Sequence, residues 1–145
     1  HASGLSKEQI HVPLYYKLGV RAFSKDRLPA MTSHVDIFPT LLHVILKEEP
    51  GVDLMEGRSI LSENRSSFAI SARYNASRTP YEFLIHNGSH KMIARFCDEK
   101  NIFASKALRI ISIKDESDRE ISIDQSTIEE QFGQAIEKLC THSDE

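Results

Sequence analysis

The chain has 145 residues and a formal net charge of −3 at neutral pH, with 40% hydrophobic and 27% charged residues. These values are typical of one ordinary globular domain and exclude a disordered or fibrous protein. No apolar run reaches the ~20 residues that span a bilayer, and the basic residues are scattered along the sequence. We therefore expect neither a transmembrane segment in this chain nor a nucleic-acid partner.

The first part of the sequence predicts one strand and one helix. It begins without Met and without a secretory signal pattern, so we expect it to be part of a longer protein. Residues 10–17 carry apolar side chains on both faces, which predicts a strand buried on two sides that begins at Leu14. Apolar residues then recur at helical spacing, which predicts a helix over 36–46 with Asp36 as its cap and Pro39 in its first turn.

The second part predicts an antiparallel meander followed by a helix. Four short extended segments lie at 67–73, 81–86, 91–96 and 108–114, and Asn87-Gly88 predicts a type I′ hairpin. Ser126 and Glu129 form a capping box that opens a helix to about Cys140. The apolar face of this helix should cover the meander; it consists of Ile128, Phe132, Ala135, Ile136 and Leu139. The expected fold is α+β, in the order strand, helix, four-strand antiparallel meander and C-terminal helix.

Three motifs carry a family resemblance. They are His-Val-Pro-Leu at 11–14, Ser-His-Val-Asp-Ile-Phe-Pro-Thr-Leu-Leu at 33–42 and Gly-Arg-Ser-Ile-Leu at 57–61. In this order and spacing the chain resembles the C-terminal part of sulfatases and their alkaline-phosphatase-superfamily relatives, closest to bacterial inner-membrane sulfatase-like proteins. The resemblance covers roughly residues 1–114 and implies a larger alkaline-phosphatase-like α/β fold. Residues 1–62 would be the last strand and helix of its catalytic core, and 63–145 its C-terminal antiparallel sheet with a covering helix.

The resemblance implies a metal-dependent hydrolase or phosphoryl/sulfuryl transferase at the extracytoplasmic face of a bacterial inner membrane. The nucleophile and most ligands of the divalent metal would precede this chain, so the isolated chain should be inactive and hold no cofactor. Its one candidate site residue is His1, which would contact the substrate or the metal in the parent protein. Asp36, Pro39 and Thr40 would set the helix start, and Gly57 would allow a turn.

The expected partner is the N-terminal catalytic part of the same protein, with self-association through the unfinished edge of the core as a further possibility. One alternative is a catalytically silent relative that binds or regulates at the membrane, since fold does not determine function. Another is a stand-alone interaction domain. Upstream sequence would distinguish these hypotheses, because the metal ligands and the nucleophile should lie there.

The remaining candidates point mainly to structural roles. The seven histidines are dispersed: His34 lies beside the cap, His43 lies among apolar neighbours, and His86 and His90 flank the hairpin, where two imidazoles alone make a poor zinc site. The two cysteines, Cys97 and Cys140, lack the spacing of a zinc site and are either buried thiols or a bridge. Three Asn-x-Ser patterns would suit a secreted or lysosomal protein, although chance explains them more simply; they begin at Asn64, Asn75 and Asn87.

Overall fold

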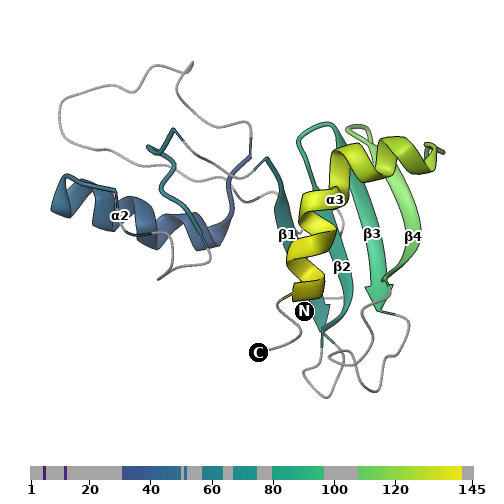
Figure 1. Ribbon diagram of the computed structural model, residues 1–145, viewed down its shortest axis with the longest axis horizontal. Helices are drawn as coiled ribbons and strands as arrows, with labels where there is room; N and C mark the ends of the chain where they lie inside the picture. Colours follow the sequence, from purple (N-terminus) through teal and green to yellow (C-terminus); the bar gives the residue numbers. More distant parts are fainter. Residues whose placement is uncertain are drawn as a thin grey trace. The chain divides into compact units, whose positions relative to one another are not determined.

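The computed structural model describes residues 5, 12, 31–49, 51, 57–63, 67–74, 80–96 and 108–141. Its elements run in the order η2 (His34–Asp36), α2 (Ile37–Leu46), β1 (Ala69–Tyr74), β2 (Pro80–His86), β3 (His90–Phe96), β4 (Leu108–Asp115) and α3 (Gln125–Thr141) (Figure 1). The α+β class is therefore confirmed. The strand predicted from Leu14 lies outside the described residues. No helix in the described ranges is both long and apolar enough to cross a membrane.

The chain divides into two compact units. One comprises Pro13–Ala69, and the other combines His1–Val12 with Ile70–Glu145. The first unit contains η2 and α2, and the second contains nearly all of the sheet together with α3.

The four strands form one sheet in the order β1-β2-β3-β4, which confirms the predicted meander. Strands β2 and β3 are antiparallel, with Phe83 opposite Ala94. Strands β3 and β4 are also antiparallel, with a bulge that leaves Ile111 of β4 without an opposite residue. The predicted strand limits agree with the observed ones to within two residues at each end.

The hairpin between β2 and β3 is present, but its turn differs from the predicted type. A type I′ turn at Asn87-Gly88 requires a positive φ at both residues, and here only Gly88 has one, at 93°. The amide of Asn87 donates to the carbonyl of His90 at 3.2 Å, so Gly88 and Ser89 are the central residues. A positive φ at the first central residue alone is the pattern of a type II′ turn. Asn87 instead accepts hydrogen bonds through Oδ1 from the amides of Ser89 and His90.

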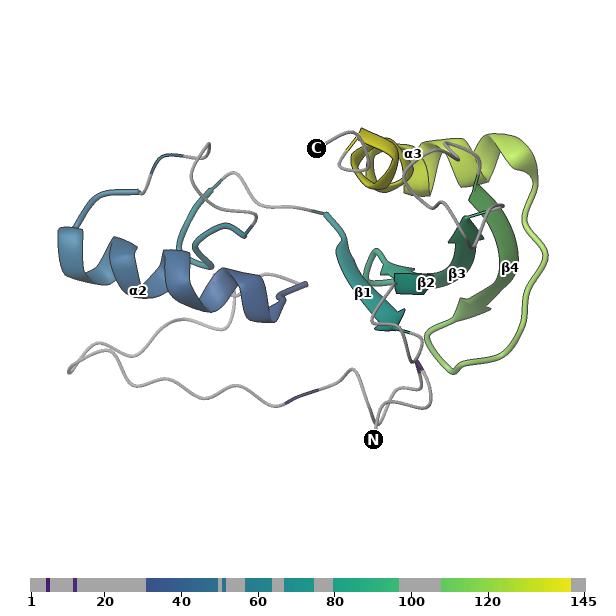
Figure 2. The same ribbon diagram turned by 90° about the horizontal axis from the view of Figure 1, so that it is seen from below.

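Helix α3 covers one face of the sheet (Figures 1 and 2). Ile128, Phe132 and Ala135 are buried, and Phe132 is only 1% exposed. Toward the end of the helix, Leu139 and Cys140 pack against the edge-to-face rings of Phe83 and Phe96; these and the neighbouring apolar side chains form a core cluster. The predicted face of the helix is thus the one that meets the sheet.

The start of α3 lies one residue earlier than predicted, and its cap is a different residue. Asp124 precedes the helix, and its Oδ1 accepts from the hydroxyl of Ser126 at 2.5 Å and from the amide of Thr127 at 2.8 Å. Together with a hydrogen bond from the hydroxyl of Thr127 to Oδ2, these contacts lower the pKa of Asp124 to about 2, and the Ser126 hydroxyl contributes most. The predicted capping box at Ser126 and Glu129 is therefore wrong, because an aspartate two residues earlier holds the first free amide.

A tight turn after β4 fixes the position of a second carboxylate. Oδ1 of Asp115 accepts from the amides of Ser117 and Arg119 at 2.8 and 3.0 Å, and the Arg119 amide is the main cause of a lowered Asp115 pKa. Asp118 in this turn has a φ of 60° and forms an ion pair with the ammonium group of Lys91. Lys91 is 3% exposed, so its charge is paired inside the protein.

Candidate functional site

Two of the three motifs that carry the family resemblance meet in the described structure. Gly57 lies against the backbone just before α2: a Cβ at Gly57 would lie 2.0 Å from the carbonyl oxygen of Val35 and 2.8 Å from the amide nitrogen of Asp36. Because both neighbours are backbone atoms, no side chain can be accommodated there. Gly57 was expected to allow a turn. In the structure, its missing side chain allows two backbone segments to approach closely.

Side chains of η2 and α2 hold the segment that follows Gly57. Oδ1 of Asp36 accepts from the amide of Arg58 at 2.9 Å, and Oδ2 accepts from the amide of Ser33 at 2.7 Å. The hydroxyl of Thr40, which is 1% exposed, accepts from the amide of Ile60 at 3.0 Å and donates to the carbonyl of Asp36 at 2.5 Å. We call this arrangement of Asp36, Thr40 and Gly57 the clamp.

The clamp changes the role predicted for Asp36. Asp36 does occupy the cap position of α2, as expected, but its side chain makes no capping hydrogen bond to the helix. A short 3-10 turn, η2, precedes α2 and turns the carboxylate toward Ser33 and Arg58 instead. The aspartate therefore joins two chain segments 22 residues apart, and it closes a capping box with Ser33 at the start of η2 instead of capping α2.

His43 and two serines extend the clamp along the same side of α2. Nδ1 of His43 lies 3.0 Å from the hydroxyl oxygen of Ser59, which also accepts from the amide of Leu61 at 3.1 Å. Ser62 donates to the carboxylate of Glu49. Ser59 is 1% exposed, so this serine–histidine pair is enclosed and lacks the open approach that a nucleophile needs. The prediction that His43 is a satisfied structural histidine is confirmed.

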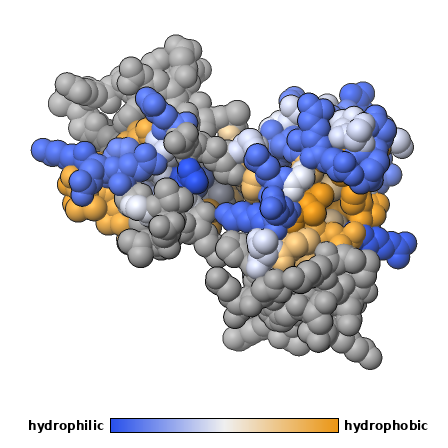
Figure 3. Space-filling model, in the orientation of Figure 1, coloured by the Kyte–Doolittle hydropathy of each residue, from blue (hydrophilic) through white to orange (hydrophobic). Residues whose placement is uncertain are grey.

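The opposite side of α2 is apolar and exposed. Phe38, Leu41 and Ile45 follow one another at helical spacing and are 61%, 47% and 71% exposed, and Figure 3 shows hydrophobic side chains on the surface of this helix. We call these three residues the outer face of α2. Of the apolar residues whose spacing predicts this helix, Ile37 and Leu42 are half-buried, whereas Leu41, Ile45 and Leu46 are exposed. The buried positions of the helix are Pro39 and Thr40. An exposed apolar patch of this kind marks an interaction surface.

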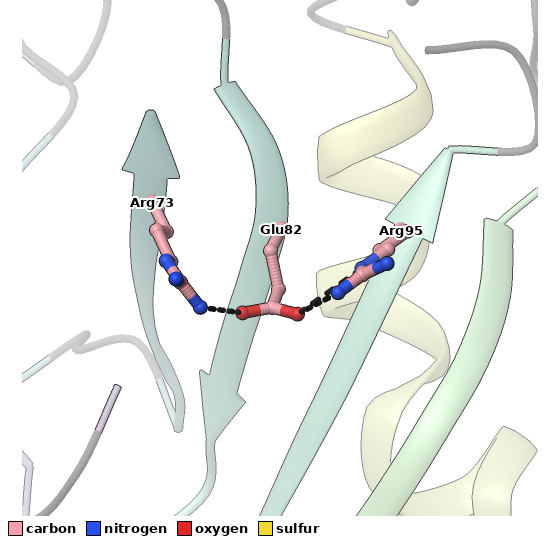
Figure 4. Close-up of polar contacts among 3 residues, drawn as sticks. All are labelled: Arg73, Glu82 and Arg95. Carbon is pink, nitrogen blue, oxygen red and sulfur yellow. Dashed lines mark hydrogen bonds and ion pairs between the residues drawn. The ribbon is translucent and has the colours of Figure 1, made fainter. Parts of the chain in front are cut away.

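The sheet carries a second polar cluster, which spans three strands. Glu82 of β2 lies between Arg73 of β1 and Arg95 of β3 (Figure 4). Its Oε2 lies 3.3 Å from Nη1 of Arg73, and its Oε1 accepts from Nε and Nη2 of Arg95 at 3.1 and 2.9 Å. Glu82 is 7% exposed, so its charge is compensated on both sides within the protein. Sequence reasoning missed this cluster; the signal was a charged residue between two apolar neighbours within a predicted strand, at Glu82 and at Arg95.

The histidines do not form a reactive group. His34 is exposed in η2. His86 lies opposite Lys91 in the sheet register, so the two histidines that flank the hairpin, His86 and His90, are not directly opposite each other. His1, the candidate site residue, lies outside the described residues, as do Cys97 and the Asn-x-Ser patterns at Asn64 and Asn75. In the parts of the chain that the structure describes, no three His, Cys, Asp or Glu side chains are grouped to hold a metal ion.

Comparison with known proteins found no matching family model, no matching curated protein and no matching solved structure.

Proposed function

We propose that this chain is the C-terminal part of a sulfatase-like, metal-dependent hydrolase or phosphoryl/sulfuryl transferase, and that it acts structurally by completing the wall of the catalytic core. The observation that supports the proposal most directly is the clamp. The residues that join in it, Asp36, Thr40 and Gly57, belong to two of the three motifs on which the family resemblance rests. These residues contact one another in the folded chain. Proteins that share this fold would need the same residues at these positions, which explains why they form a family pattern.

The outer face of α2 supports the second part of the proposal, that the chain is incomplete as a packed core. A helix that is apolar on all sides is normally buried on all sides. Here the clamp occupies one side, while Phe38, Leu41 and Ile45 on the other side remain exposed. We propose that the N-terminal catalytic part of the same protein packs on this face.

The chemistry in this proposal comes from residues outside the chain. They would bind the divalent metal and supply the nucleophile, with His1 as the one contribution of this chain to the substrate or metal site. The parent protein would lie at the extracytoplasmic face of a bacterial inner membrane. The catalytically silent alternative shares the same packing and differs only in those upstream residues.

A pair of matched variants tests the packing. Ile45→Asn changes the outer face of α2, and Glu48→Asn changes an exposed polar position just after the same helix. In the isolated chain both should shift the unfolding midpoint little, because both side chains are exposed there. In a longer protein with its upstream region, Ile45→Asn should destabilise by about 1–3 kcal/mol and Glu48→Asn should not, because an amide would then be buried in an apolar contact. Equal effects of the two variants in the longer protein would contradict the proposal.

Activity is tested with aryl sulfate and aryl phosphate esters. The isolated chain should hydrolyse neither, whereas the longer protein should show hydrolysis that a chelator abolishes. Chelator-sensitive hydrolysis that scales with the purified isolated chain would overturn the assignment. A longer protein that packs as proposed but lacks the upstream ligands and shows no hydrolysis would support the silent alternative.

A further inference from the structure

The hairpin between β2 and β3 directs two backbone amides at one side-chain oxygen. Oδ1 of Asn87 accepts from the amide of Ser89 at 3.1 Å and from the amide of His90 at 2.8 Å. The amide of Asn87 itself donates to the carbonyl of His90 at 3.2 Å, which closes the turn. The side-chain amide of Asn87 is therefore held in the turn, and the two donors polarise its carbonyl group.

The residue after Asn87 leaves a backbone nitrogen open to reaction. Gly88 has no side chain that could shield its amide. Within the described part of the chain, the Gly88 amide donates no hydrogen bond. Gly88 is half-buried and Ser89 is exposed, so water reaches the turn. An asparagine followed by an unshielded amide nitrogen carries both an electrophile, its side-chain carbon Cγ, and a nucleophile next to it along the chain.

We propose that Asn87 is a site of spontaneous deamidation. The nucleophile is the Gly88 nitrogen, and the amides of Ser89 and His90 form an oxyanion hole around Oδ1. The Gly88 nitrogen gives its proton to hydroxide and bonds to Cγ of Asn87, while Oδ1 takes up the negative charge. The bond from Cγ to Nδ2 then breaks, Nδ2 takes a proton from water, and ammonia leaves a succinimide ring. Water adds to one of the two ring carbonyls and opens the ring to aspartate or isoaspartate.

The geometry of the two donors fits this reaction. An oxyanion hole stabilises charge that develops in the transition state, and its donors lie roughly 2.7–3.1 Å from the oxygen that becomes charged. The amides of His90 and Ser89 lie in that range, at 2.8 and 3.1 Å from Oδ1. Because the hairpin fixes both donors in advance, they need not reorganise as the charge develops. The folded turn should therefore promote the reaction beyond the rate of an Asn-Gly pair in a flexible peptide.

The reaction changes the charge and the backbone at this end of the sheet. Either product replaces a neutral amide with a carboxylate, which adds one negative charge to a chain whose formal net charge is −3. An aspartate accepts from the same two amides, and its charge strengthens those hydrogen bonds. An isoaspartate adds one carbon atom to the backbone before Gly88, so the contact between the amide of residue 87 and the His90 carbonyl must change. The proposed hydrolase function plays no part in this inference.

The test follows the complete 145-residue chain during incubation in mildly alkaline buffer, with water as the only co-reactant. Trypsin releases residues 79–91, in which Asn87 is the only asparagine. Mass spectrometry then measures the mass increase that accompanies replacement of the amide by a carboxyl group. The other three asparagines serve as internal references, because larger residues than glycine follow them; they are Asn64, Asn75 and Asn101. We expect Asn87 to react fastest.

Two variants at one position isolate the oxyanion hole. Ser89→Pro removes an amide donor, because proline has no backbone N–H, whereas Ser89→Ala keeps that donor. Ser89→Pro should slow the deamidation of Asn87 at least about tenfold, and Ser89→Ala should change its rate by less than about twofold. Amide spectra check that both variants retain the pairing of β2 with β3.

A synthetic peptide of residues 79–91 keeps the Asn-Gly pair without the rest of the sheet and should react more slowly than the folded chain. This comparison decides the question if Ser89→Pro disturbs the hairpin. Equal rates in the two folded variants, a folded chain that reacts no faster than the peptide, or an Asn87 that reacts no faster than the other asparagines would overturn the proposal.

Discussion

The sharpest prediction concerns Gly57→Ala. The added Cβ would lie 2.0 Å from the carbonyl oxygen of Val35, a contact between a methyl group and backbone that no rotamer change relieves. The segment after Gly57 must therefore move away from α2. That movement breaks the hydrogen bond from the Arg58 amide to Asp36 and the one from the Ile60 amide to Thr40.

The cost follows from those two hydrogen bonds. A hydrogen bond to a charged carboxylate contributes about 1.5–3 kcal/mol and one to a neutral hydroxyl about 0.5–1.5 kcal/mol. Their combined loss, about 2–4.5 kcal/mol, should accelerate exchange of the Arg58 and Ile60 amides by a factor of about 30 to 2,000, since each 1.4 kcal/mol is a factor of ten.

Amide hydrogen exchange followed residue by residue is the measurement, and Gly51→Ala is the control. Gly51 lies in the same unit, but a Cβ there would meet nothing within 4 Å, so Ala should leave the exchange of Arg58 and Ile60 unchanged. If Gly57→Ala also leaves their exchange within about threefold of the wild type, the two backbone segments do not approach as described and the clamp is wrong.

Four further predictions concern the sheet and its helix. Phe132→Ala should lower the free energy of unfolding by about 3–5 kcal/mol in a denaturant titration, because the ring is fully buried; a change under about 0.5 kcal/mol would mean that α3 does not pack on the sheet. Glu82→Gln should cost about 1–3 kcal/mol in the same assay, since it removes the buried carboxylate with which both guanidinium groups form ion pairs, and a stabilised variant would refute the ion pairs described. Gly133→Ala should raise stability by about 0.5–1 kcal/mol, because this helix position has open space; destabilisation would reveal a contact where none is expected. Asp124→Asn should be less stable than the wild type near pH 6, because the folded protein lowers the pKa of Asp124 to about 2 and so favours the ionised carboxylate. This difference in stability should disappear as the pH falls from about 4 through about 2. A difference that persists below pH 2 would contradict this origin.

Features with a local cause were predictable from the sequence. The meander follows from four extended segments separated by turn residues, and the helix over Ile37–Leu46 follows from apolar spacing and from Pro39 in its first turn. The predictions were wrong at the ends of elements where two nearby residues could fill the same structural role, such as a helix cap or a turn position. Asp124 competes with Ser126 as a cap, and Gly88 can be either the first or the second central residue of a turn.

Features that join distant segments were not predictable. Asp36 is a good helix cap by type, and nothing near it in the sequence indicates that Arg58 lies within reach of its carboxylate. Likewise, the charges of Glu82 and Arg95 are visible in the sequence, but their pairing depends on the register of two strands. The buried side of α2 was predicted from hydrophobicity, which fails where hydrogen bonds from Thr40 fix the packed side.

The order of the strands also has a consequence for how quickly this part of the chain acquires its structure. Because spatial order equals sequence order, each strand pairs only with its neighbour along the chain, and the three-residue connection after His86 closes the shortest of these loops. Proteins dominated by such local pairings fold faster than those that must close long loops. We expect β2 and β3 to pair first and the outer strands β1 and β4 to add on either side. Helix α3 should then pack last on the sheet that has already formed.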